Sequence, residues 1–336
     1  MHENTSFFYD LTPEHVLQAV EAVGVRCTGR ALALNSMENR VYEVEIEVPD
    51  LEKLASRHEA FRVVKFYRPG RWTKEQILEE HQFLADAIEA ELPVVAPLAF
   101  ADGSTLQQMA GVGIWYAVFP KVGGRINDEF NRADLIRLGR LLARLHTVGA
   151  GRESEHRISL NPNSYGRENL KYLTESGVIP NTYQSRYSDL VNFICDWSDP
   201  FFKKIPTQRI HGDCHIGNII WNTQGCFLVD FDDMVRGACV QDLWLLVPGR
   251  DKYAQDNLEI LLEGYESMRP FDRSTLRIIE PLRALRMIHF SAWIARRWED
   301  PSFKRVFVDF GTERYWGEQV VSLNEVTEIL RGAELR

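Results

Sequence analysis

The sequence predicts an α+β chain of two lobes, a small lobe of strands and helices followed by a larger, mainly helical lobe. Strand-like runs dominate the first third of the chain, and helical periodicity dominates after the Pro/Gly stretch at 120–124. The length of 336 residues also fits about two units of ~150 residues. We therefore expect an N-terminal lobe over 1–120, a hinge at 121–124 and a C-terminal lobe over 125–336.

Helix caps and alternating apolar runs define the elements of the small lobe. Thr12 followed by a proline begins a helix that ends near Gly24. Thr73 forms a capping box with Gln76 and opens a second helix, which runs to about Leu92. Alternating or apolar runs predict strands at 30–34, 41–48, 61–67, 94–100 and 114–119.

Helical spacing is the main signal in the larger lobe. Leucines at 135, 138, 142 and 145 mark one long helix, and further helices are expected at 255–264 and 275–298. Short strands are expected at 209–210, 219–221 and 226–230. The strands thus surround a polar segment at 211–218, which carries the most informative motif of the chain.

Composition excludes several classes of protein. Hydrophobic residues make up 45% of the chain and charged residues 26%, which is typical of a globular domain. A net charge of −9 argues against a nucleic-acid partner and against an anionic membrane surface. No apolar run approaches the ~20 residues of a membrane span, and the five scattered cysteines fit reduced thiols. We expect a cytoplasmic protein, and the sequence is compatible with a monomer.

The segment 209–221 contains His-x-Asp-x4-Asn, formed by His211, Asp213 and Asn218, and Asp230 ends the following strand. In a chain like this the pattern arises by chance roughly two times in a hundred. Phosphoryl transfer from ATP explains these residue types, because Asn218 and Asp230 offer the hard oxygen ligands that Mg²⁺ prefers. Asp213 would accept the proton of the attacking hydroxyl, and His211 would brace the loop.

Lys65 lies in the apolar run 62–67, where a lone lysine is costly unless it has a partner. On the helix that begins after Thr73, Glu80 lies at the edge of the apolar face, whereas Glu79 lies well away from it. We therefore predict that Lys65 holds the α- and β-phosphates of ATP and pairs with Glu80.

His211-Gly212-Asp213-x-His215-x-Gly217-Asn218, followed by Val229-Asp230-Phe231, resembles the aminoglycoside phosphotransferase and choline kinase-like branch of the protein-kinase-like superfamily. The resemblance covers most of the chain. Within that branch, the loop at 35–42 and the length are similar to a bacterial stress response kinase group. The resemblance implies a bilobal protein-kinase-like fold, with a small β-sheet-plus-helix lobe that binds the nucleotide and a larger helical lobe that binds the acceptor. It also implies a serine/threonine protein kinase, with itself as a candidate acceptor.

The resemblance implies further site residues. The loop at 35–42 lacks Gly-x-Gly-x-x-Gly, so Ser36 and nearby backbone amides would contact the phosphates, and the backbone from Phe119 to Val122 would bind the adenine edge. Asp242 would brace the catalytic loop, or cap a helix. Asp230-Phe231-Asp232 stands where protein kinases have Asp-Phe-Gly, and no Ala-Pro-Glu follows. Regulation by an activation loop is therefore in doubt.

Other functions stay open at this point. The same site would serve a kinase for a small hydroxyl metabolite, such as an aminoglycoside, choline or homoserine kinase, or a pseudokinase that only binds. The acidic net charge slightly favours cationic acceptors. A metal-dependent hydrolase could hold zinc with His211, Asp213, Cys214 and His215, but that interpretation explains neither Asn218 nor Asp230 nor Lys65.

Two groups of residues have a structural and a functional interpretation. Trp293, Arg296, Arg297 and Trp298 could line an acceptor groove, or the tryptophans could pack while the arginines pair with Glu299 and Asp300. For Cys214 we favour the interpretation as a small packed residue over that as a redox-active thiol.

Overall fold

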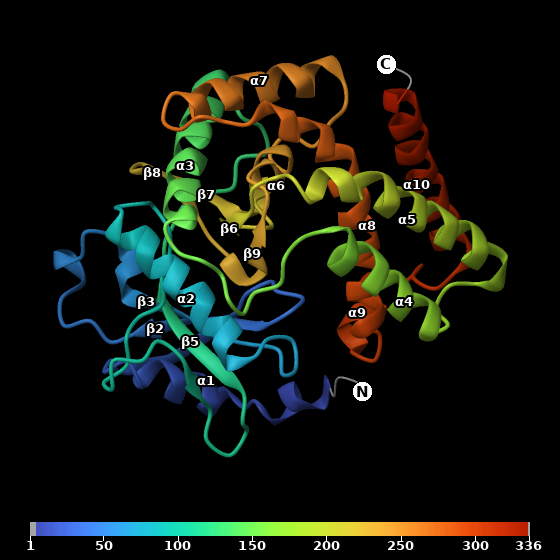
Figure 1. The fold of residues 1–336 in the computed structure, drawn as a ribbon. Coiled ribbons are helices and arrows are strands. Elements are labelled where there is room, and N and C mark those ends of the chain that lie inside the picture. Colours follow the sequence, from blue (N-terminus) through green and yellow to red (C-terminus); the bar gives the residue numbers. More distant parts are fainter. Residues whose placement is uncertain (1–4, 335–336) are drawn as a thin grey trace.

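The small lobe of the computed structural model, which describes residues 5–334, is built on one antiparallel sheet (Figure 1). Its strand order is β1-β2-β3-β5-β4, so β3 is the central strand. The strands are β1 (Cys27–Ala33), β2 (Arg40–Ile46), β3 (Phe61–Phe66), β4 (Gln107–Gln108) and β5 (Trp115–Pro120).

Side chains of β3 alternate between two faces of the sheet. Val64 and Phe66 are fully buried in a core that includes residues of α1 (Pro13–Glu21), which lies under the sheet. Lys65 points to the opposite face, toward α2 (Lys74–Glu89). Thr12 caps α1 and Thr73 caps α2, as predicted. This alternation brings a charged side chain between the sheet and α2.

The larger lobe is mainly helical. Its longer helices are α3 (Arg132–Ala150), α4 (Glu168–Glu175), α5 (Asn181–Phe202), α7 (Lys252–Glu266), α8 (Ile279–Arg296) and α10 (Glu313–Glu334). Its shorter elements are β6 (Gln208–Ile210), β7 (Ile219–Asn222), β8 (Gly225–Leu228), β9 (Val235–Gly237), α6 (Val240–Trp244) and α9 (Pro301–Val306). The predicted α+β fold class, a small sheet-containing lobe before a larger helical lobe, is confirmed.

One hydrophobic core joins the two lobes. Phe83 and Leu84 of α2 are buried in the same cluster as Leu142 of α3 and Leu228 of β8. Figure 1 shows α2 on the side of the sheet that faces the larger lobe. The position of α2 is therefore fixed by both lobes. The predicted boundary at 121–124 lies between β5 and α3, and it stays a prediction.

Some expected elements differ from the structure. The apolar run 94–100 forms no strand, although Val94 makes an isolated bridge to Leu228 and the Leu98 backbone N–H donates to the Val118 carbonyl oxygen. Pro93 and Pro97 lack the backbone donors that a ladder requires, so the run packs as an extended segment. Helices α4, α5, α9 and α10 and strand β9 were not among the elements predicted from the sequence. None of the helices within residues 5–334 combines the length and apolarity needed to span a membrane.

Candidate active site

Residues 211–218, the predicted catalytic loop, follow β6 directly and are held by the neighbouring α6. The Asp242 carboxylate accepts hydrogen bonds from the backbone N–H groups of His211 (2.9 Å) and Gly212 (2.8 Å). Gly212 has a φ of +84°, and a Cβ there would lie 2.2 Å from the Asp233 carbonyl oxygen. Only glycine fits this approach. Asp242 lies inside α6, so its interpretation as a helix cap is wrong.

The imidazole of His211 acts as a scaffold inside the loop. Its ring packs on Phe231 with centroids 4.4 Å apart, and its Nε2 lies 3.0 Å from the Val229 carbonyl oxygen. The ring therefore ties the catalytic loop to the segment that carries Asp230. A second histidine, His146 of α3, lies 3.0 Å from Asp242 and is fully buried. These contacts leave Asp213 as the carboxylate that the loop presents.

Asp213 is flanked by two cationic or potentially cationic side chains. Arg286 Nη1 of α8 donates to Asp213 Oδ1 at 2.5 Å, and His215 Nε2 lies 3.4 Å from Asp213 Oδ2. Burial alone would raise the pKa of Asp213, but the His215 hydrogen bond and the Arg286 guanidinium outweigh it and hold the pKa well below its usual range. The carboxylate is therefore ionised. Sequence reasoning missed Arg286, which is one of several arginines on its helix.

Asn218 and Asp230 present oxygen atoms to one cavity. The Asn218 side-chain N–H donates to the Asp213 carbonyl at 2.9 Å, which leaves its amide oxygen available as a ligand. Asp230 adopts a left-handed conformation with φ +60°, and its side chain is 59% exposed. One carboxylate and one amide oxygen fit a hard divalent cation such as Mg²⁺, with phosphates and water as the remaining ligands. The residues thus fit the predicted metal.

Three carboxylates surround the ammonium of Lys65, which is 7% exposed. Asp232 is nearest at 2.8 Å, followed by Glu80 at 3.6 Å and Asp230 at 3.7 Å. Burial opposes the charged form, but these carboxylates, Asp232 first, raise the pKa of Lys65 well above its ordinary value. The predicted Lys65–Glu80 pair is present. The stronger contact with Asp232 was not predicted.

Glu80 is itself held by the larger lobe. Arg157, in the connection after α3, donates to Glu80 Oε2 at 2.9 Å and to the carbonyl oxygens of Gln76 (2.8 Å) and Asp232 (2.6 Å). Its side chain is completely buried. Glu79 lies away from Lys65, as expected, but its carboxylate accepts from the backbone N–H groups of residues 155, 156 and 157. Both contacts fix α2 against the larger lobe.

Two cavities adjoin at the site, and the larger of these two, of about 530 Å³, lies between the lobes and gathers residues from both. It is lined by all the predicted nucleotide and metal residues: Ser36, Lys65, Glu80, Phe119, Val122, Asn218 and Asp230. The Ser36 hydroxyl also accepts from the backbone N–H of Asn39 at 3.3 Å. Residues far apart in sequence thus meet around one space of nucleotide size.

The second cavity, of about 300 Å³, adjoins the larger one and shares Glu38 and Trp293 with it. Asp213 and Arg286 line it, so the catalytic loop faces this space. Its remaining lining includes aromatic side chains, among them Tyr165 and Phe290, and the charged residues Arg71 and Asp233. A molecule bound here would lie beside both Asp213 and the contents of the larger cavity.

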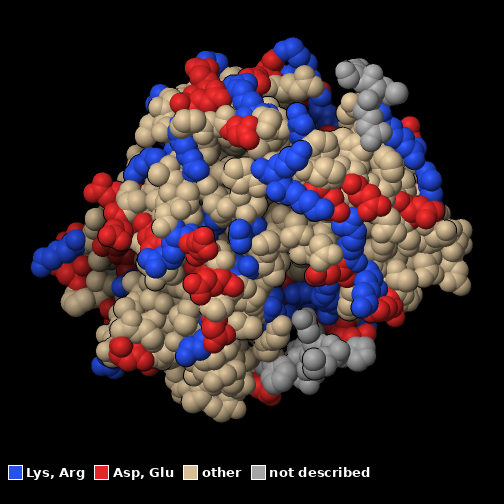
Figure 2. Space-filling view, viewed as in Figure 1, with Lys and Arg blue, Asp and Glu red and all other residues tan. Residues whose placement is uncertain are grey.

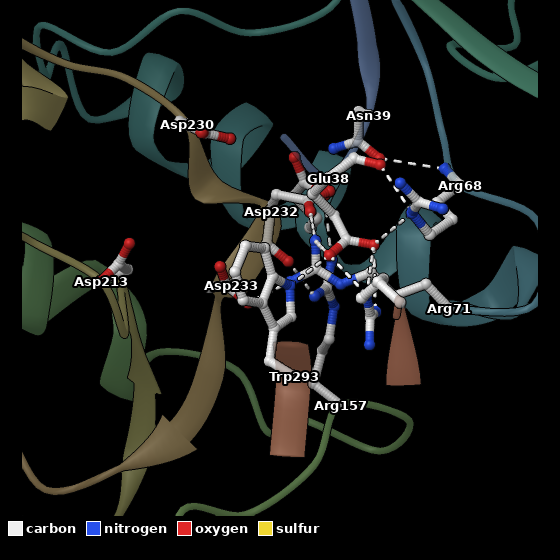
Figure 3. Close-up of polar contacts among 12 residues, drawn as sticks. Glu38, Asn39, Arg68, Arg71, Arg157, Asp213, Asp230, Asp232, Asp233 and Trp293 are labelled. Carbon is white, nitrogen blue, oxygen red and sulfur yellow. Dashed lines mark hydrogen bonds and ion pairs between the residues drawn. The ribbon is translucent and has the colours of Figure 1, made fainter. Parts of the chain in front are cut away.

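A buried charged cluster around Glu38 joins the loop at 35–42 to α8 (Figure 3). Glu38 accepts from Arg297 Nε (3.0 Å) and Nη2 (3.0 Å), from the Trp293 indole, and pairs with Arg68 (3.1 Å). In Figure 3 Asp213 and Asp230 lie to one side of this cluster. The acceptor-groove hypothesis stays a prediction, because Trp293 lines the second cavity and a smaller pocket is lined by Trp293, Arg296 and Arg297. Arg297 itself is 4% exposed and engaged by Glu38. It also pairs with Glu38 rather than with Glu299 or Asp300.

Two alternatives find no support in the described residues. Within residues 5–334, no group of three or more His, Cys, Asp or Glu side chains is arranged to hold a metal ion, which argues against the zinc interpretation. Cys214 is fully buried, and burial raises the pKa of its thiol well above the usual value. It is a packed residue, as first interpreted.

The fold and the paired cavities define a kinase-type phosphotransferase. A family model described as "Phosphotransferase enzyme family" matches residues 32–277, and the chain belongs to this family. The chain is 38% identical to "Stress response kinase A" of Salmonella paratyphi A and 37% identical to that of Escherichia coli K12. Each comparison spans 341 aligned residues, 100% of this chain and 98% of the relative. A 37% identical relative from Salmonella typhimurium is named "Serine/threonine protein kinase RdoA" and is covered equally.

Two solved structures that resemble this chain are kinases named for small molecules. An amicoumacin kinase in complex with AMP-PNP and Ca²⁺ superposes with a TM-score of 0.71, at 20% identity over 93% of this chain and 95% of that one. A microcompartment-associated aminopropanol kinase gives 0.65, at 17% identity over 95% and 97%. These likenesses confirm the bilobal kinase-like fold.

Proposed function

We propose that this protein is an ATP- and Mg²⁺-dependent kinase that transfers the γ-phosphate to a hydroxyl group, most directly serine or threonine of proteins, in a stress response. The observation that carries the proposal is the meeting of Asp213, Asn218, Asp230 and Lys65 at two adjoining cavities. The larger cavity would hold ATP and the second cavity the acceptor. Phosphotransfer needs both sites side by side, because the hydroxyl must approach the γ-phosphorus in line.

Each residue has a distinct role in this proposal. Lys65 binds the α- and β-phosphates, and Glu80 keeps its ammonium in place. Asn218 and Asp230 would hold Mg²⁺, which neutralises charge on the phosphates when bound. Ser36 and the neighbouring amides contact the phosphates, and the backbone of residues 119–122 binds the adenine edge from the hinge at 121–124. Asp213 orients the acceptor hydroxyl and accepts its proton.

A protein acceptor and a small-molecule acceptor are both supported by specific observations. The names of the full-length relatives favour serine and threonine of proteins, with the kinase itself among the candidate acceptors. The second cavity of about 300 Å³ and the small-molecule kinases of the same fold favour a compact hydroxyl compound. We propose the protein acceptor first, because those relatives match this chain over its full length.

The decisive experiment compares the wild type with Asp213→Asn. Purified enzyme and γ-labelled Mg·ATP are added to a cytosolic extract, and label is counted separately in protein and in small molecules. We expect label in protein Ser and Thr that falls at least ~10²-fold in the variant, which is the lower range for loss of a general base. Nucleotide binding should persist. Label only in small molecules would favour a metabolite kinase, and no label would favour a pseudokinase.

A further inference from the structure

The proposed general base is already occupied by an arginine. Arg286 Nη1 lies 2.5 Å from Asp213 Oδ1, and His215 approaches the other carboxylate oxygen at 3.4 Å. A hydroxyl that gives its proton to Asp213 must come within hydrogen-bond distance of one of these two oxygens. The acceptor hydroxyl must therefore reach the carboxylate beside the Arg286 guanidinium when it enters the second cavity.

Arg286 has the donors to bind something besides Asp213. Its guanidinium carries five N–H donors, and one of them is used in a hydrogen bond to a described residue. Its side chain is 41% exposed and lines the second cavity beside Asp213. A planar guanidinium in this position suits a carboxylate or phosphate, which it can bind through two parallel hydrogen bonds.

The other charges of the second cavity already have partners. Glu38 is bound by Arg297 and Arg68, and Asp233 is bound by Arg71. His289 is stacked on Tyr165, and burial together with nearby arginines lowers its pKa to about 3, so it is neutral. A ligand in this cavity therefore changes the charge balance chiefly at the pair of Asp213 and Arg286.

We propose that Arg286 selects acceptors in which the reacting hydroxyl lies beside a carboxylate or another anionic group. The anion binds the remaining N–H donors of the guanidinium while the hydroxyl approaches Asp213, so that the negative charge brought next to Asp213 is compensated. A neutral or cationic acceptor offers Arg286 no such partner. This inference rests on the proposed kinase function and names the chemistry of its acceptor. The inference differs from the expectation drawn from the net charge of −9, which favours cationic acceptors. It relies instead on the charged groups that line the second cavity.

The charges on the protein surface do not favour acceptors of one sign. Figure 2 shows acidic and basic side chains interspersed over the visible face, without one sign covering it. At physiological ionic strength, exposed charges beyond about 8 Å are largely screened. An acceptor in the second cavity is therefore governed by the groups that line the cavity.

The transfer itself is the one proposed above. The acceptor oxygen forms a bond to the γ-phosphorus, the bond from that phosphorus to the β–γ bridging oxygen breaks, and ADP leaves with that electron pair. The hydroxyl proton passes to the Asp213 carboxylate. Arg286 takes no part in bond making or breaking. It is a specificity-determining residue that binds the anionic group of the acceptor.

The test uses matched acceptors and matched variants. Three serine peptides differ only in the residue after serine, which is Glu, Gln or Lys, and two small acceptors are glycerate and glycerol. Transfer is measured with wild type, Arg286→Met, Arg286→Lys and the control Arg331→Met. Arg331 of α10 is also a partly exposed, ion-paired arginine, at 51% exposure and 3.0 Å from Glu328, and it lines neither cavity.

We expect wild type and Arg331→Met to prefer the anionic acceptor, which is the Glu peptide among the peptides or glycerate among the small acceptors. The preference should be at least tenfold in kcat/KM over the uncharged acceptor of the same kind. Arg286→Met should abolish that preference, and Arg286→Lys should restore part of it, which a purely structural role would not do. Preference within the peptides points to an acidic protein segment, and preference for glycerate points to a small hydroxy acid.

Equal use of neutral and anionic acceptors by the wild type, or an unchanged preference in Arg286→Met and Arg286→Lys, would overturn the inference. If the wild type labels extract acceptors in the Asp213→Asn comparison yet shows no such preference, the kinase proposal stands and only the role of Arg286 fails. If it labels nothing in either experiment, the kinase proposal fails first.

Discussion

Replacing Arg157 with methionine tests whether α2 is held in place from the larger lobe. The change keeps most of the side-chain volume but removes the charge, and it leaves Glu80 Oε2 and the carbonyl oxygens of Gln76 and Asp232 without these donors. Removing one partner of a buried ion pair costs about 3–5 kcal/mol. The Arg157 side chain is fully buried, so solvent screening does not reduce this figure.

We therefore expect Arg157→Met to lower the free energy of unfolding by about 4 kcal/mol, which corresponds to a fall in Tm on the order of 10 °C. Urea unfolding at pH 7 measures the difference directly. We also expect a higher KM for ATP with an unchanged KM for the acceptor, because Glu80 is freed while the second cavity is untouched. Millimolar guanidinium should partly restore ATP affinity to Arg157→Ala.

Arg144→Met is the matched control. Arg144 of α3 also bridges to α2, donating to the carbonyl oxygens of Ala90 and Glu91, but it does so at the surface. Its replacement should change the free energy of unfolding by less than about 1 kcal/mol. A loss this small in Arg157→Met, with ATP affinity unchanged, would refute the argument that the larger lobe positions Glu80.

Two further predictions concern the loop at 35–42 and the metal. Glu38 is buried, and burial opposes its ionisation, but Arg71, Arg297 and Arg68 lower its pKa below 4.5. The ionised carboxylate should therefore stabilise the fold fully above about pH 4.5. This stabilisation should disappear as the pH falls through the lowered pKa. Glu38→Gln should accordingly cost about 3 kcal/mol at pH 7, and urea unfolding should show that cost shrinking toward pH 3. Asp230→Asn removes the one carboxylate we assign to Mg²⁺, so the half-saturating Mg²⁺ concentration in an ADP-release assay should rise at least tenfold; a wild-type titration would contradict the assignment.

The local part of the site could be predicted from the sequence. Asp213, Asn218 and Asp230 belong to one short segment in which spacing and flanking strands carry the signal. The Lys65–Glu80 pair could be predicted because a lysine in an apolar strand needs a partner. The helical periodicity of the next helix places Glu80 at the edge of its apolar face. All five line one of the two cavities.

The residues that sequence reasoning missed act across long separations. Arg286 is 73 residues from Asp213, and Arg157 is 77 residues from Glu80. A chain with many arginines gives no local pattern that distinguishes these two, since their partners depend on how helices pack. Asp232 was read only as a departure from Asp-Phe-Gly, although its carboxylate is the nearest one to Lys65. The run 94–100 was misread because its apolar residues pack without forming a ladder.

The shared core of α2 and the larger lobe affects how this chain folds during synthesis and whether its lobes can be exchanged with those of other proteins. Phe83, Leu84 and Ala87 of α2 are 0–1% exposed, and the cluster that buries them includes residues more than fifty positions later in the chain, such as Leu142 and Leu228. A ribosome that has released only the first lobe presents those apolar side chains to water. We therefore expect the two lobes to fold together, because a small lobe moved to another protein would need a partner that supplies the other half of that core.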